Sequence, residues 1–138
     1  YQQEYYGRQG VFFFDCQGFQ VSKVHFRNNN GYGLVLYDST GGHIQQNIFS
    51  INSIKNSHHL SAKEKSKIMG GGLHIIQNKG YTSPYIISGN QFINNSAPNI
   101  GGALLMDLSY CAGFNFSVTD SSFIGNMAGI AGGAMAFM

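Results

Sequence analysis

The aspartates that end three short apolar strings are the residues of this chain best suited to chemistry. Asp15, Asp38 and Asp107 close the strings GVFFFD, GLVLYD and GALLMD. If the chain places Asp15 and Asp38 on adjacent parallel strands, they lie about 5 Å apart. That separation suits the two carboxylates of a retaining glycosidase or a shared cation. The sequence therefore makes Asp15 and Asp38 the candidate catalytic pair, with Asp107 in the same column and Gln77 between.

A simpler interpretation is that these aspartates end strands and cap turns in solvent. Cleavage of acidic polysaccharides also needs a basic residue for the sugar acid, and no Arg or Lys recurs beside them. The Gly42-His43 pair lacks the second glycine and the Asp partners of polygalacturonase-like sites. We therefore favour the turn-capping role, and polysaccharide cleavage remains the alternative.

The elements that position the aspartates belong to a sequence repeat. Four Phe residues each have an Asn three positions later, and five glycines open similar apolar strings. The first copies are 23 residues apart and the later ones 30 or 31, which indicates one unit with loop insertions, as in a solenoid. The repeated residues are Phe26, Phe49, Phe92 and Phe123; Asn29, Asn52, Asn95 and Asn126; and Gly10, Gly33, Gly72, Gly102 and Gly133.

Each repeat divides into three short β segments, and no apolar stripe of helical period is visible. One segment follows the glycine, one contains the Phe, and one centres on an apolar residue five positions before the Phe. The centres of this last segment are Val21, Ile44, Ile87 and Val118. The pattern predicts an all-β fold: a right-handed parallel β-helix solenoid of about five coils with three short strands per coil, forming a single domain over residues 1–138.

In such a solenoid each repeated position becomes a column along the axis. The Phe column places aromatic faces against one another, worth about 0.5 to 1.5 kcal/mol per pair beyond area burial. An Asn amide both donates and accepts, so it can bond the turn backbone and the Asn of the next coil. Glycine permits a positive φ or a close approach of two backbones.

The motif Phe-x-x-Asn followed by Gly-Gly-Ala and an aliphatic residue resembles the repeats of the chlamydial polymorphic outer membrane proteins. Similar repeats occur in large surface proteins of protists and other eukaryotes. Residues 92–104 and 123–135 match the motif well, the copy at Phe26 keeps one Gly, and the copy at Phe49 is split by an insertion. The resemblance implies a pectin-lyase-like fold, a cell-surface setting and an adhesive or scaffolding role.

Composition agrees with that setting. Charged residues make up 10% of the chain and the net charge is +2, which is too little for a nucleic-acid footprint. The longest apolar runs are far shorter than a membrane span of about 18 residues. Asn94 and Asn115 each begin an N-glycosylation sequon, and Asn115 is the better candidate because its neighbours Phe114 and Phe116 should point inward.

The longest departure from the repeat is an insertion at about 53–70. Ser61 and Glu64 have capping-box spacing, which predicts a turn of helix there. The basic run at 63–67 would suit a recognition loop, and the adjacent His58 and His59 would suit a metal site, although no third ligand has a fixed spacing. We favour a solvated loop over both. Cys16 and Cys111 should lie about three coils apart, too far for a disulfide.

These observations predict a non-catalytic extracellular structural or adhesive scaffold, which could form part of a surface appendage or filament. A polysaccharide-binding or polysaccharide-cleaving module is the alternative. The chain ends directly after a strand, which suggests an internal segment of a longer polypeptide. Expected partners are further coils of that polypeptide, copies of itself, other surface proteins and glycans. No cofactor or metal is expected.

Overall fold

The fold is known from a computed structural model, which describes residues 10–53, 61–65, 71–78, 83–108 and 115–138. Within these residues the regular structure is almost entirely β-strand, with one short helix, α1 (Ala62–Lys65). All of the strand pairings described are parallel. The predicted all-β class with parallel strands is confirmed.

Most of the strands belong to three parallel sheets. The five-stranded sheet has the order β1 (Val11–Phe14), β4 (Leu34–Tyr37), β7 (Leu73–Ile76), β11 (Leu104–Asp107) and β15 (Met135–Phe137). The β2 sheet consists of β2 (Gln20–Ser22), β5 (His43–Gln45), β8 (Tyr85–Ser88) and β12 (Phe116–Thr119). The β3 sheet consists of β3 (His25–Arg27), β6 (Ile48–Ser50), β9 (Gln91–Ile93) and β13 (Ser122–Ile124).

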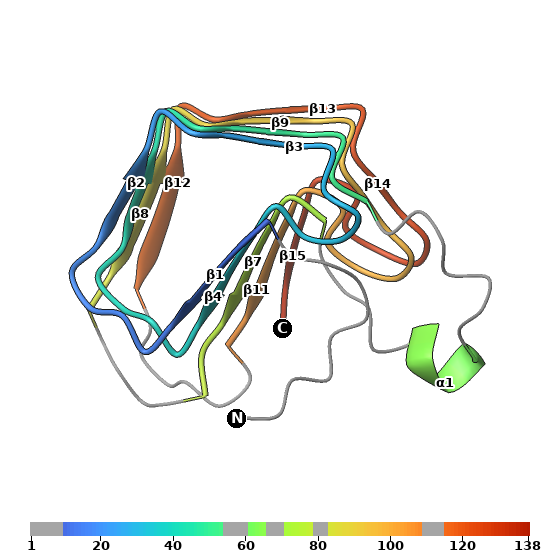
Figure 1. Cartoon of the computed structure of the whole chain (residues 1–138), viewed down its shortest axis with the longest axis horizontal. Coiled ribbons are helices and arrows are strands. Elements are labelled where there is room, and N and C mark those ends of the chain that lie inside the picture. Colours follow the sequence, from blue (N-terminus) through green and yellow to red (C-terminus); the bar gives the residue numbers. More distant parts are fainter. Residues whose placement is uncertain (1–9, 54–60, 66–70, 79–82, 109–114) are drawn as a thin grey trace.

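The chain visits these three sheets repeatedly and in the same order. After β1 it passes through β2, β3 and β4, then through β5, β6 and β7, and so on to β15. Each strand therefore pairs with its equivalents from the rounds before and after it, and Figure 1 shows the successive rounds nested on one another. We call one round a coil. A small additional sheet of β10 (Ser96–Ala97) and β14 (Met127–Ala128) follows the β3 sheet and was not predicted.

The core lies between the three sheets and is built from residues that alternate along each strand. In the β2 sheet, Val21, Ile44 and Ile87 are paired in register and buried, as the predicted strand centres require. In the five-stranded sheet, Leu34 and Leu36 point to the same core. Because strand residues alternate between the two faces, this pattern fixes which side chains remain outside.

The five-stranded sheet is also covered on its outer face. Val35 and Ile76 are buried there in a second cluster with Tyr32, and Phe12 and Tyr37 pack against it. Strands buried on both faces explain why the glycine strings are apolar throughout rather than alternating.

The predicted glycine column needs a correction in its last two members. The structure pairs Leu73 with Leu104 and not with Ala103, so Gly102 and Gly133 lie one residue earlier than the column requires. The reason is core packing: the observed register buries Leu104 beside Leu73, and a one-residue slip would turn it to the opposite face. In the observed register, the position directly before the first paired strand residue is occupied by Gly10, Gly33, Gly72, Ala103 and Ala134.

The first three residues at this position are glycines because the backbones of successive coils approach closely there. A Cβ at Gly10, Gly33 or Gly72 would lie 2.6, 2.7 or 2.5 Å from a carbonyl oxygen of the following coil. Of the two roles that the sequence left open for these glycines, close backbone approach is therefore the one observed.

The insertion after β6 contains the predicted turn of helix. Helix α1 begins at Ala62, directly after Ser61, and Figure 1 draws it to one side of the stacked strands. The stretches 54–60 and 66–70, with His58 and His59, lie outside the described residues.

Candidate functional site

The four repeated Phe residues form one continuous column of stacked rings. The ring centroids of neighbours are 4.8 Å apart at each of the three steps, and the ring planes differ by 8° or less. Phe26, Phe49 and Phe92 are buried, whereas Phe123, in the last coil described, is half-buried. The stacked rings therefore connect each strand of the β3 sheet with the equivalent strand of the next coil.

The four repeated Asn residues form a ladder of amides at the turn after the β3 sheet. The Nδ2 group of Asn29 donates to Oδ1 of Asn52 at 2.7 Å, and the same contact recurs from Asn52 to Asn95 at 2.9 Å and from Asn95 to Asn126 at 3.0 Å. Nδ2 of Asn52 also donates to the carbonyl oxygen of Phe26, at 2.9 Å. The hydrogen bonds of these amides therefore join equivalent turns of successive coils.

A second amide ladder, absent from the sequence prediction, lies at the turn between the β2 and β3 sheets. Nδ2 of Asn47 donates to Oδ1 of Asn90 at 3.1 Å and to the carbonyl oxygen of Val21 at 2.9 Å. Both Asn residues are fully buried. Their signal in the sequence is an Asn two residues before Phe; it is hard to see because Val24 and Ser121 hold that position in the first and last coils.

The candidate acids Asp15 and Asp38 lie at the ends of adjacent strands, in paired register after Phe14 and Tyr37. Both have left-handed backbones, with φ of 54° and 48°. The carboxylate of Asp38 is buried and accepts a hydrogen bond from the backbone N–H of Asn78 at 2.7 Å. Asp38 therefore acts as a turn residue in this structure, while Asp15 is exposed.

Asp107 does not belong to the predicted aspartate column. It pairs with Ile76, which pairs with Tyr37, so it lies one residue before the level of Asp38 and Gln77. The same one-residue shift that misplaces Gly102 is responsible.

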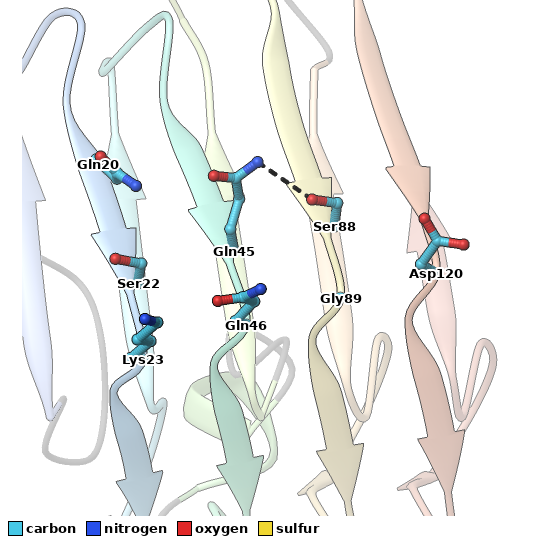
Figure 2. Close-up of a pocket in the computed structure, with 8 residues that line it drawn as sticks. All are labelled: Gln20, Ser22, Lys23, Gln45, Gln46, Ser88, Gly89 and Asp120. Carbon is cyan, nitrogen blue, oxygen red and sulfur yellow. Dashed lines mark hydrogen bonds between the residues drawn. The ribbon is translucent and has the colours of Figure 1, made fainter.

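A polar groove crosses the outer face of the β2 sheet and has a volume of about 550 Å³. Its floor is made of amide and hydroxyl side chains from neighbouring strands, which Figure 2 shows side by side. Gln20 and Ser22 come from β2, Gln45 from β5 and Ser88 from β8. Nε2 of Gln45 donates to Oγ of Ser88 at 3.3 Å.

One rim of the groove is the turn at which the four strands end. The turn residues are Lys23, Gln46, Gly89 and Asp120, and all four have positive φ, between 49° and 64°. Lys23 follows β2 and Asp120 follows β12, which are the two outermost strands of the sheet, and Gln46 and Gly89 lie between them. The groove thus carries opposite charges at its two ends and is neutral between them.

His74 is a buried titratable group on the outer face of the five-stranded sheet. Its ring lies 5.3 Å from that of Tyr32, with the planes inclined at 42°. Burial lowers the pKa of His74 to about 4, against a smaller opposing effect of the Asp107 charge. The imidazole is therefore neutral at physiological pH.

The two sequons differ in their surroundings. Asn94 is exposed at a turn with φ of 53°, and Asn115 is exposed directly before β12. Phe116, expected to point inward, pairs with buried Tyr85 but is 38% exposed in the last coil described. Phe114 lies outside the described residues.

Cys16 is half-buried and is not part of a disulfide among the described residues. Cys111 lies outside them. In the part of the chain that the structure describes, no cluster of three His, Cys, Asp or Glu residues could hold a metal ion, and no helix is long and apolar enough to cross a membrane.

Comparisons of this chain with protein-family models, with curated proteins and with solved structures find no significant match.

Proposed function

We propose that this chain is a stretch of right-handed parallel β-helix that serves as a non-catalytic structural or adhesive scaffold at a cell surface. The β-helix assignment is supported by the ordered return of the chain to three parallel sheets. Right-handedness is inferred from the general rule that about 98% of parallel crossovers have that hand. The repeat motif supports a pectin-lyase-like fold of the kind found in polymorphic outer membrane proteins.

The single observation that carries the scaffold role is the amide ladder from Asn29 to Asn126. At each step an amide bonds the equivalent amide of the next coil. Buried amides of this kind are costly to leave unpaired, at about 1 to 3 kcal/mol each, so the bonded ladder holds each coil to the next along the axis. A polar surface with only 10% charged residues suits an extracellular location and contact with copies, surface proteins or glycans.

Polysaccharide cleavage remains the second candidate because Asp15 and Asp38 occupy one level on adjacent strands. Against this role, the buried Asp38 carboxylate is bonded to the backbone of Asn78. A catalytic acid or base must instead reach the substrate oxygen or a water beside it.

Two experiments test the proposal. Antibody labelling of intact, unpermeabilised cells of the source organism should detect the protein, and labelling only after permeabilisation would contradict a surface scaffold. A reducing-end assay on soluble polysaccharides should give no turnover, either with the unmodified protein or with Asp38→Asn. Turnover that Asp38→Asn abolishes would establish the enzyme alternative.

A further inference from the structure

We propose that the polar groove on the β2 sheet is a binding site for an uncharged glycan chain, which lies across the strands and along the direction of coil stacking. The inference rests on the proposed adhesive role and names its ligand class. The site is separate from Asp15 and Asp38, which follow the five-stranded sheet.

The chemistry of the groove floor matches a hydroxyl-rich ligand. Gln20, Ser22, Gln45 and Ser88 offer amide and hydroxyl groups that both donate and accept hydrogen bonds. A sugar hydroxyl likewise donates and accepts, so it can use both functions of each side chain. The bond from Gln45 to Ser88 already orients one of these amides before a ligand arrives.

The spacing of the strands that form the groove is similar to the length of one sugar unit in a glycan chain. Its side chains come from neighbouring parallel strands, which lie about 4.8 Å apart. One pyranose unit of an extended glycan is about as long as this spacing, so successive sugars can meet successive coils in similar ways. Gly89 leaves room between Gln46 and Asp120, since a Cβ there would have only Gln46 within 4 Å.

The charges favour a neutral chain over a polyanion. Lys23 and Asp120 lie at opposite ends of the groove, three strand spacings or about 14 Å apart. A polyuronate or a nucleic acid would gain one cation and meet one carboxylate, whereas phosphate-binding surfaces cluster Lys and Arg.

A protein partner fits less well. The cores of protein interfaces are enriched in aromatic residues, Met and Arg, and the residues that line this groove include none of these. The ligand must therefore be held by hydrogen bonds from amides and hydroxyls rather than by an apolar anchor.

Titration of the ¹⁵N-labelled protein with cellotetraose, mannotetraose, N-acetyl-chitotetraose and tetragalacturonate tests the inference. At least one neutral tetrasaccharide should bind and shift the side-chain amide signals of Gln20 and Gln45, with little dependence on salt. The double variant Gln20→Ala/Gln45→Ala should weaken that binding about tenfold or more, as expected for two lost hydrogen bonds.

Gln91→Ala is the matched control. Gln91 is exposed and begins a three-residue strand with the same burial pattern as β2, but on a different sheet. The Gln91→Ala substitution should leave the affinity for the neutral tetrasaccharide unchanged. Failure of all three neutral tetrasaccharides to bind, stronger binding of tetragalacturonate, or equal affinity of the double variant would overturn the inference. These binding results do not affect the outcomes expected for cell-surface labelling and for the reducing-end assay. The scaffold proposal is therefore tested independently of the glycan site.

Discussion

The ring of Phe49 lies parallel to the ring of Phe92, with centroids 4.8 Å and planes 5° apart, although the two residues are separated by an insertion that includes α1. Both side chains are fully buried. Stacking is therefore kept in register across a change in loop length, which indicates that the column and not the loop sets the position of each coil.

Truncation of this column should be strongly destabilising. Phe49→Ala removes a ring that is stacked on both sides, and we expect it to lower the free energy of unfolding by about 3 to 5 kcal/mol. Phe14→Ala is the control, because Phe14 is 47% exposed. Urea denaturation measures both, and similar losses in the two variants would contradict a central role for the column.

The amide ladder predicts that its members cannot be replaced by a carboxylate. Asn52→Asp removes the donor that bonds both Phe26 and Asn95, and it buries a charge beside two oxygen acceptors. We expect a loss of more than about 2 kcal/mol in stability at pH 7, smaller at low pH where the carboxyl is protonated. Asn28→Asp, at an exposed turn with φ of 55°, should cost far less. Equal urea midpoints for the two variants would argue against the ladder.

The burial of His74 predicts a loss of stability in acid. Its pKa is about 4 in the folded protein and 6.5 in the unfolded chain, so the unfolded chain binds more protons between these values. This group's contribution is complete above pH 6.5 and falls by about 3 kcal/mol as the pH decreases to 4. His74→Leu should reduce the pH dependence of the urea midpoint between pH 7 and 4. If the dependence were the same in both proteins, the buried neutral imidazole would be contradicted.

The two sequons should differ in occupancy after expression through a eukaryotic secretory pathway. We expect Asn115 to be glycosylated in preference to Asn94, whose side-chain oxygen lies against Gly125 of the following coil. Mass spectrometry before and after glycosidase treatment measures occupancy, with Asn115→Gln and Asn94→Gln identifying the site. A glycan carried mainly by Asn94 would contradict this preference.

The columns could be predicted from the sequence because a fixed distance between Phe and Asn survives every change in loop length. The glycine register could not. The doublets Gly71-Gly72 and Gly101-Gly102 can be aligned in two ways one residue apart, and the doublets themselves do not indicate the observed register, in which Leu104 pairs with Leu73 in the core.

The other features that sequence reasoning missed depend on contacts between coils. The ladder of Asn47 and Asn90 has no Asn in the first coil, where Val24 holds the equivalent position. Val24 joins the ladder through its backbone N–H, which donates to Oδ1 of Asn47. The polar groove combines residues such as Ser22, Gln45 and Ser88, which are 23 and 43 positions apart and share no motif. Such sets become visible only once the register of the coils is known.

The rate of disulfide formation between engineered cysteines tests the register of the coils most directly. In a background of Cys16→Ser and Cys111→Ser, the pair Gln91→Cys/Ser122→Cys joins exposed residues that are opposite one another in β9 and β13. Adjacent strands bring such Cα atoms within the range of about 4.4 to 6.8 Å that a disulfide needs. The account predicts rapid closure of this pair and much slower closure of the offset pair Gln91→Cys/Ile124→Cys. Faster closure of the offset pair, or no closure of either, would contradict in-register stacking.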